Sequence, residues 1–247
     1  MILNVAAYHF TAIDDAPALV AQLRERAKKA ALRGTVLVAH EGINLFLAGE
    51  SRAIGSFLAA LRTDARFTDI LVKESRSATQ PFARLKVKLK REIIAFRRAD
   101  AAPASGRAAA VAPTTLARWL HYGHDDGGRR VVLLDARNRE EVAYGTFAGA
   151  LTLPIDNFSD LPDALAAQRE ALADATVISF CTGGIRCEKA ALWMRQEGMP
   201  NVMQLDGGIL GYFEKVGGYG YEGRCFVFDQ RVALDTALQP LVDGARC

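Results

Sequence analysis

The sequence predicts an α/β protein of two parts with different sheet types, and three observations support this fold class. The first half orders its β-like and helical runs as strand, helix, strand, strand, helix, strand. The second half alternates short apolar runs with helical segments, which is typical of a parallel sheet with helices on both faces. Between the halves, residues 98–113 are rich in Ala, Pro, Ser and Gly, as a linker would be. We therefore expect domains at residues 1–97 and 114–247.

The elements of the first half follow from side-chain periodicity and from turn residues. The predicted strands are residues 3–10, 35–39, 44–48 and 69–74, and the predicted helices are residues 16–32 and 51–61. Pro17 suits a first helical turn and Gly34 suits a helix stop. Residues 40–43 read as the turn of a hairpin between the two short strands. This β-α-β-β-α-β order matches the ferredoxin-like plan, an α+β domain.

A further β-like run follows, in which apolar and basic residues alternate. A period of two places Leu85, Val87 and Leu89 on one face and the cations on the other. The basic residues are Arg84, Lys86, Lys88, Lys90 and the adjoining Arg91. They form either a solvated strand face or a ridge that contacts phosphates. We favour the ridge, because crowded like charges repel unless an anion neutralises them, and residues 1–100 carry 17 Lys and Arg against 10 Asp and Glu.

In the second half, polar residues stand where predicted strands end. The predicted strands are residues 131–134, 151–154, 176–180 and 202–205, and the predicted helices are residues 161–172, 187–196 and 209–216. Functional groups of parallel sheets collect at the carboxyl ends of the strands. Asp135, Cys181 and Asp206 all fall at such ends.

The segment from Cys181 to Arg186 is the main candidate for chemistry. Gly183 and Gly184 permit positive φ angles, so that the N–H groups of Thr182 to Ile185 point at the sulfur, and a helix begins directly afterwards. A thiol held in this way ionises easily, and the thiolate is its reactive form. The alternative is an inert core cysteine, which needs neither glycine nor arginine nearby. Cysteine phosphatases use Cys-x5-Arg, whereas the shorter Cys-x4-Arg loop here suits one added sulfur better than a phosphate.

The supporting residues have alternative roles. Arg186 either braces the loop or binds an anion, with a carboxylate such as Asp135 as its partner, or is simply a surface arginine. Asp135 and Arg137 are expected to tie strand ends together near the site. Cys187 either resolves an oxidised Cys181 by forming a disulfide or packs away from the site as a helix residue, and we favour the second interpretation.

Composition excludes several classes of function. The cysteines are Cys181, Cys187, Cys225 and Cys247, and the histidines are His9, His40, His121 and His124. They form no Cys-x-x-Cys pair, no metal-ligand spacing and no two-histidine, one-carboxylate cluster, and there is no Rossmann glycine fingerprint. We therefore expect no metal and find no cofactor evident. No run of 18 apolar residues predicts a membrane span, and the poor match to a signal peptide predicts a cytoplasmic protein with reduced thiols.

Four ordered segments resemble the signatures of a rhodanese domain, an α/β domain whose loop cysteine carries a persulfide. These segments are residues 135–138, 145–150, 181–186 and 206–208. The loop alone would favour sulfur transfer from thiosulfate or from a protein persulfide.

The resemblance extends over nearly the whole chain. Residues 40–44, 81–88, 181–190 and 223–232 together resemble the bacterial tRNA uridine hydroxylase family, which joins a ferredoxin-like domain to a rhodanese domain. This resemblance implies 5-hydroxylation of the wobble uridine of tRNA with O2 as co-substrate and with the loop cysteine required. The basic ridge then becomes a tRNA surface. The alternatives are a sulfurtransferase and a non-enzymatic RNA-binding protein. Phe46 stands where the family more usually has Thr, and Tyr221 stands where Trp is expected, a change that would affect a base-stacking surface there.

Overall fold

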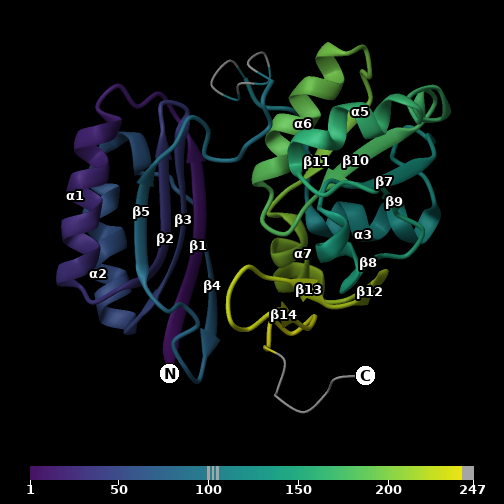
Figure 1. Ribbon diagram of the computed structural model, residues 1–247. Coiled ribbons are helices and arrows are strands. Elements are labelled where there is room, and N and C mark those ends of the chain that lie inside the picture. Colours follow the sequence, from purple (N-terminus) through teal and green to yellow (C-terminus); the bar gives the residue numbers. More distant parts are fainter. Residues whose placement is uncertain (99–100, 102, 104–105, 241–247) are drawn as a thin grey trace. The chain divides into compact units, whose positions relative to one another are not determined.

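The computed structural model describes residues 1–98, 101, 103 and 106–240, and the chain divides into two compact units (Figure 1). Unit 1 comprises residues 1–95 together with residues 229–231. Unit 2 comprises residues 96–228 and the remaining residues from 232 onward. No helix in the described part of the chain is long and apolar enough to span a membrane.

Unit 1 is a five-stranded sheet with two helices on one face (Figure 1). Its elements are β1 (Ile2–Phe10), α1 (Ala16–Lys29), β2 (Arg33–Ala39), β3 (Gly42–Gly49), α2 (Ser51–Arg62), a 3-10 turn (Ala65–Phe67), β4 (Val72–Ser77) and β5 (Leu85–Leu89). The strand order β4-β1-β3-β2-β5 confirms the ferredoxin-like plan and adds a fifth strand. β5 pairs in parallel with β2, and the other neighbours are antiparallel.

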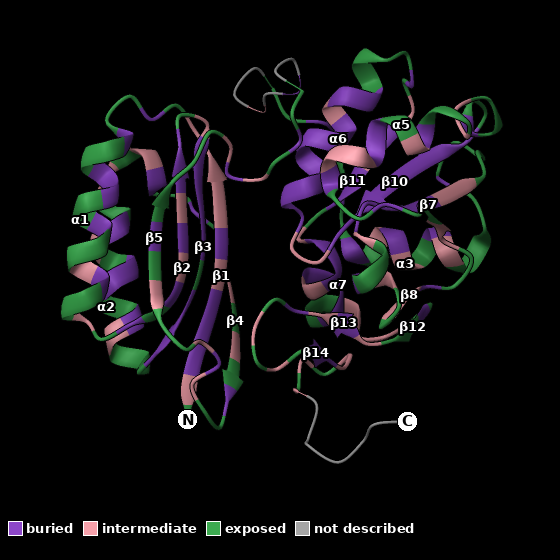
Figure 2. Cartoon of the chain, in the orientation of Figure 1, coloured by how far each residue is buried: buried purple, intermediate pink, exposed green. Residues whose placement is uncertain are grey.

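The predicted bounds differ from the structure where local backbone geometry intervenes. α1 ends at Lys29 rather than at residue 32, because Ala31 takes a positive φ of 51° and the N–H of Leu32 turns back to the carbonyl of Ala27. The fourth strand begins at Val72 and not at residue 69, because the chain is still in a turn after Phe67. The apolar side of the sheet and the inner faces of both helices form one core (Figure 2).

Unit 2 is built on a five-stranded parallel sheet of order β6-β11-β10-β7-β9. Its strands are β6 (Ala110–Val111), β7 (Val131–Asp135), β8 (Gly145–Phe147), β9 (Leu151–Thr152), β10 (Thr176–Phe180), β11 (Val202–Leu205), β12 (Tyr221–Gly223), β13 (Cys225–Phe226) and β14 (Ala233–Leu234). Its helices are α3 (Pro113–Tyr122), α4 (Arg139–Val142), α5 (Leu161–Ala166), α6 (Ile185–Gln196) and α7 (Gly208–Val216), with 3-10 turns at Phe158–Asp160 and Glu170–Leu172. Helices α5 and α6 lie on one side of the sheet, and α3 and α7 lie on the other (Figure 1).

The predicted α/β plan of the second half is confirmed, with one helix shorter than expected. Residues 161–172 were predicted as a single helix. The α-helix stops at Ala166, and the chain continues into the 3-10 turn Glu170–Leu172. The central strand β10 is buried along its whole length, which fits its apolar sequence.

The predicted linker differs from the structure, because its described residues belong to unit 2. Ala110 and Val111 form strand β6, which pairs with β11 at the edge of the sheet. Ala101 and Ala108 are buried. Upstream of them, the Phe96 ring stacks on Phe158 at 4.6 Å between centroids. Small residues suit a flexible connection, but here they allow close packing. Residues 99, 100, 102, 104 and 105 lie outside the described part of the chain.

Residues 229–231 also differ from the predicted second domain, because they belong to unit 1. Arg231 donates a hydrogen bond from Nη1 to the hydroxyl of Ser75 in strand β4 at 2.7 Å. The N–H of Gln230 donates to the carbonyl of Pro81 at 3.2 Å. The chain therefore leaves unit 2 for three residues and then returns to it.

Candidate functional site

The loop after β10 encloses the sulfur of Cys181. Gly184 has a φ of 100°, which favours glycine, and its N–H lies 3.1 Å from Sγ of Cys181. Helix α6 begins at Ile185, two residues earlier than predicted, so Cys187 lies inside its first turn. Cys181 itself is fully buried. The sulfur thus lies against the N–H of Gly184 at the start of a helix, as the sequence predicted. Gly183, in contrast to the expectation, is not among the residues with a positive φ.

The amino terminus of α7 supports the loop from behind. The N–H of Ile209 donates to the carbonyl of Cys181 at 2.9 Å, and that of Leu210 donates to the carbonyl of Thr182 at 3.1 Å. Gly208 has a φ of 62°, and a Cβ atom there would lie 2.5 Å from the carbonyl oxygen of Cys181. Glycine at this position therefore allows α7 to approach the loop closely enough to bind its carbonyl groups. This contact gives the Asp206-Gly207-Gly208 signature a physical reason.

The side chain of Cys187 interacts with that of Cys181, which contradicts the expectation that it packs away from the site. Both thiols are completely buried and unbridged. Burial raises the pKa of Cys181. A hydrogen bond from Cys187, the charge of Arg186 and the N–H groups of Arg186 and Gly184 lower it by more, so the pKa lies below that of a free thiol. Burial and the adjacent Cys181 sulfur raise the pKa of Cys187 well above its ordinary value. Of the two thiols, Cys181 is therefore the one that ionises more easily.

Arg186 is paired with Glu141, not with the predicted Asp135. Its guanidinium donates from Nη1 to Oε2 of Glu141 at 2.5 Å and from Nη2 to Oε1 at 2.7 Å, and both side chains are buried. The hydroxyl of Thr182 donates to the same carboxylate at 3.3 Å. Burial raises the pKa of Glu141, yet the hydrogen bonds and charge of Arg186 outweigh it and hold that pKa below its usual range. Arg186 therefore braces the loop through a bidentate ion pair.

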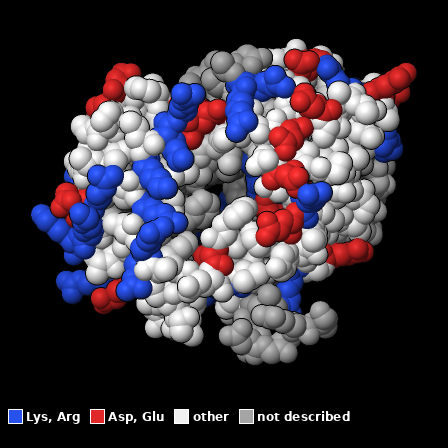
Figure 3. Space-filling model, in the orientation of Figure 1, with Lys and Arg blue, Asp and Glu red and all other residues white. Residues whose placement is uncertain are grey.

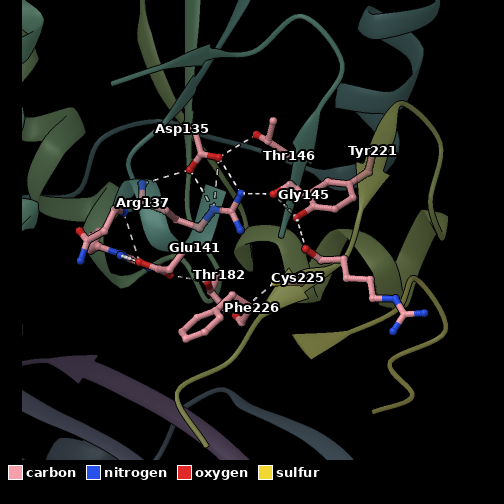
Figure 4. Close-up of polar contacts among 12 residues, drawn as sticks. Asp135, Arg137, Glu141, Gly145, Thr146, Thr182, Tyr221, Cys225 and Phe226 are labelled. Carbon is pink, nitrogen blue, oxygen red and sulfur yellow. Dashed lines mark hydrogen bonds and ion pairs between the residues drawn. The ribbon is translucent and has the colours of Figure 1, made fainter. Parts of the chain in front are cut away.

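Asp135 and Arg137 tie the end of β7 to the neighbouring β8, as the sequence predicted (Figure 4). Arg137 donates from Nη2 to Oδ2 of Asp135 at 2.7 Å and to the carbonyl of Gly145 at 2.6 Å. The hydroxyl of Thr146 donates to Oδ2 of Asp135 at 2.7 Å. Neither charged side chain is exposed to solvent. Their mutual hydrogen bonds offset the free-energy cost of removing both charges from water.

Tyr221 lies inside unit 2 and forms no exposed base-stacking surface there. Its ring packs edge-on against Phe147 and Phe213, and it is 8% exposed. Its hydroxyl donates to the carbonyl of Gly145 at 2.9 Å (Figure 4). The tyrosine is therefore a structural residue that continues the hydrogen-bonded cluster around Arg137.

Cys225 is a core residue, as predicted. It is fully buried, and burial raises the pKa of its thiol to about 12. A neutral thiol with such a pKa is a poor nucleophile. Cys247 lies outside the described residues.

The basic residues of the predicted ridge all lie in unit 1 and are exposed. Lys86 and Lys88 belong to β5, Arg84 precedes it, and Lys90 and Arg91 follow it. Figure 3 shows Lys and Arg side chains gathered in a column over this unit. The alternation of cations and apolar residues is present, although Leu89 is 49% exposed.

A hollow lies at the opposite end of the parallel sheet. It has a volume of about 390 Å³ and is lined by residues that include Arg169, Ala175, Val177, Met199 and Val202. These residues precede or begin β10 and β11, whereas Cys181 follows β10. The hollow is therefore separate from the thiol. The described residues also contain no group of His, Cys, Asp and Glu that would hold a metal ion.

Sequence reasoning missed Glu141 as a member of the site. Asn138 and Glu141 form a capping box at the start of α4, with the N–H of Asn138 donating to Oε2 at 3.2 Å. The spacing of Asn and Glu was a readable signal for that cap. The spacing does not reveal that the same carboxylate also receives Arg186, because this contact joins segments 45 residues apart.

Comparisons with known proteins cover both units. Residues 2–93 match the UPF0176 acylphosphatase-like domain, and residues 116–215 match the rhodanese-like domain. A protein of Xanthomonas campestris pv. campestris (strain 8004) named tRNA uridine(34) hydroxylase is 67% identical over 247 residues, which is 100% of this chain and 98% of that protein. A protein of the same name from Xylella fastidiosa (strain 9a5c) is 62% identical over 98% of this chain and 95% of its own.

Two solved structures each resemble one part of the chain. Acylphosphatase from Bacillus subtilis is 23% identical, covering 36% of this chain and 99% of its own, with a TM-score of 0.30. A rhodanese-related protein from Thermoplasma volcanium is 22% identical, covering 46% of this chain and 97% of its own, with a TM-score of 0.36.

Proposed function

The chain belongs to the tRNA uridine(34) hydroxylase family, and we propose that it hydroxylates the wobble uridine of tRNA at C5 with O2, using Cys181 as the reactive group. The main support for this reaction is the identity of 67%, over the full length of the chain, to the Xanthomonas campestris tRNA uridine(34) hydroxylase. These relatives do not favour the sulfurtransferase alternative. The role of Cys181 is supported by the pKa of its thiol, which Cys187, Arg186 and loop N–H groups lower.

The two thiols also fit the electron balance of such a reaction. Insertion of one atom of O2 at C5 sends the other atom to water, and this consumes two electrons and two protons. Oxidation of two thiols to one disulfide releases the same number of each. Cys181 and Cys187 form a hydrogen-bonded pair, so we propose that Cys187 closes a disulfide with Cys181 during turnover and that an external thiol reductant restores both.

The other residues of the site position this pair. Arg186 holds the loop through Glu141, and α7 holds it through the carbonyl groups of Cys181 and Thr182. The Asp135–Arg137 cluster fixes the adjacent strand ends. Because Cys181 is buried, a uracil ring reaches it only after the target nucleotide leaves its stack and the surroundings of the loop open.

The test uses the purified full chain, tRNA from a strain that lacks uridine-34 hydroxylation, and 18O2. Mass spectrometry of the tRNA digest should show 5-hydroxyuridine with one heavy oxygen, and none with Cys181→Ala. Cys225→Ala, which removes a core thiol with a raised pKa, is the matched control and should retain product. Product that lacks the heavy isotope would refute O2 as the source, and full activity of Cys181→Ala would refute the role of the thiol.

A second measurement addresses Cys187. In a single turnover without added reductant, the amount of disulfide should equal the amount of 5-hydroxyuridine formed. Product without disulfide would show that the electrons come from elsewhere.

A further inference from the structure

The sheet of unit 1 has a second face, opposite the helices, that carries aromatic and basic side chains. Successive side chains of a strand point to opposite faces, so residues that alternate with the buried core residues share this face. Tyr8 and Phe10 alternate with Ala7 on β1, and Phe46 lies between the buried Leu45 and Leu47 on β3. These three rings therefore stand on β1 and β3 of this face. The chain itself covers another part of the face, where Asn44 and Ala48 of β3 are buried.

Phe46 is the most accessible of the three. It is 39% exposed although it lies on the central strand of a five-stranded sheet. Its cross-strand partners are Ala6 on β1 and Thr35 on β2, and both are small. Because these two neighbours are small, they do not cover the Phe46 ring. A ligand that covers this ring would remove apolar surface from water, which favours binding.

Tyr8 and Phe10 extend the aromatic surface along β1. Their ring centroids lie 5.9 Å apart in an edge-to-face arrangement, and both residues are half-buried. Tyr8 pairs with Asn44, the residue two positions before Phe46. The rings thus occupy neighbouring positions of one face.

Cations border this aromatic surface. Lys86 on β5 pairs with Thr35, and Lys88 pairs with Leu37, so both lysines share the face of Phe46 and are exposed. Strand β5 lies two strands from β3, which is about 10 Å. Among the described strand residues that point to this face, none is acidic. A ligand for this surface therefore combines flat, uncharged rings with negative charges, which is the chemistry of unpaired nucleotides.

We propose that the exposed part of this sheet face of unit 1 is a stacking platform for unpaired nucleotides of the tRNA, with Phe46 under a base and Lys86 and Lys88 at its phosphates. The proposal rests on the proposed function for the identity of the RNA. Sheets that display aromatic residues on their central strands bind single-stranded RNA by this mechanism, because every base has a face that stacks. The family that the chain resembles more usually has threonine at the position of Phe46. The platform is therefore inferred from the residues of this chain and not from the family.

The experiment measures binding of the full chain to a 17-nucleotide anticodon stem-loop RNA that carries 2-aminopurine in its loop. Stacking on Phe46 should quench the fluorescence of that base, and Phe46→Ala should abolish the quenching and weaken binding by about 5- to 100-fold. Phe46→Tyr keeps an aromatic ring and should retain both signals. Leu89→Ala removes an exposed apolar side chain from the opposite face of the same sheet and should bind as the unchanged protein does.

A duplex RNA of equal length separates stacking from charge. Phe46→Ala should bind the duplex as tightly as the unchanged protein, whereas Lys86→Ala should weaken binding to both RNAs. Unaltered affinity and quenching of Phe46→Ala on the loop RNA would overturn the platform, as would an equal loss on both RNAs. Hydroxylation by the unchanged protein is measured in parallel. If hydroxylation is present but Phe46→Ala binds normally, only the platform fails; if hydroxylation is absent but the stacking signals appear, only the proposed function fails.

Discussion

Replacing Glu141 by Gln tests whether the loop depends on the buried ion pair with Arg186. The substitution keeps the shape of the side chain but removes its charge, and it leaves a guanidinium that is 7% exposed without a counter-ion. Removing one partner of a buried pair costs about 3–5 kcal/mol. With a urea dependence of about 2 kcal/mol per molar, the midpoint of unfolding should fall by about 1.5–2.5 M.

Tryptophan fluorescence is the suitable assay, because Trp119 and Trp193 both lie in unit 2 and are the only two tryptophans of the chain. The matched control is Asp156→Asn, which breaks the Arg139–Asp156 pair at 2.6 Å with both side chains more than half exposed. An exposed pair contributes at most about 1 kcal/mol, so this midpoint should fall by less than about 0.5 M. Equal shifts for the two variants would refute the argument from burial.

The pH dependence gives a second, independent readout of the same pair. The pKa of Glu141 is lowered in the folded state, so its contribution to stability is complete above the unfolded value near 4.5 and is lost as pH falls through the folded pKa. The stability difference between Glu141→Gln and the unchanged protein should therefore hold steady from pH 7 to 5 and shrink in more acidic solution. A constant difference down to pH 2 would contradict this.

Three further expectations concern the thiols, the loop glycines and the basic ridge. Alkylation of the buried Cys181 by iodoacetamide proceeds only when the loop opens, and its rate should reach half its maximum at a pH below the pKa of a free thiol. Cys187→Ala should raise that pH, because a hydrogen-bond donor is lost; an unchanged profile would contradict the pairing. Gly208→Ala should abolish hydroxylation and should lower the free energy of unfolding by more than Gly198→Ala does. Gly198 has a φ of 85° but open space around it, so its substitution should cost only about 1 kcal/mol. Equal costs would refute the close approach of α7. Lys86→Ala should reduce the slope of log affinity for tRNA against log salt by about 1, and an unchanged slope would place the phosphates elsewhere.

The fold was largely predictable because its elements are encoded by local patterns. The order of strands and helices identified both units, and residue periodicity identified the faces of β5. The close packing of residues 96–111 on unit 2 was not predictable, because alanine-rich segments suit a flexible linker and a tight contact equally well.

The site shows the same division between local and distant information. The spacing Asp-x-Arg occurs at Asp135–Arg137, Asp64–Arg66 and Asp229–Arg231, and at each place the arginine forks onto the aspartate two residues earlier. This local geometry follows from the sequence. Its setting does not, since the first pair is fully buried and the second is about 30% exposed. Partners that come from distant segments, such as Glu141 for Arg186, were missed for the same reason.

The return of residues 229–231 to unit 1 has a consequence for how the chain folds during translation. The hydrogen bond from Arg231 to Ser75 of β4 forms only after Arg231 is made, more than a hundred residues after the rest of that unit. At usual rates of synthesis this delay is about 7–30 s. Over that interval the amino-terminal unit exists on the ribosome without the contacts of residues 229–231. Its full stability therefore depends on a segment that is made after nearly all of the second unit.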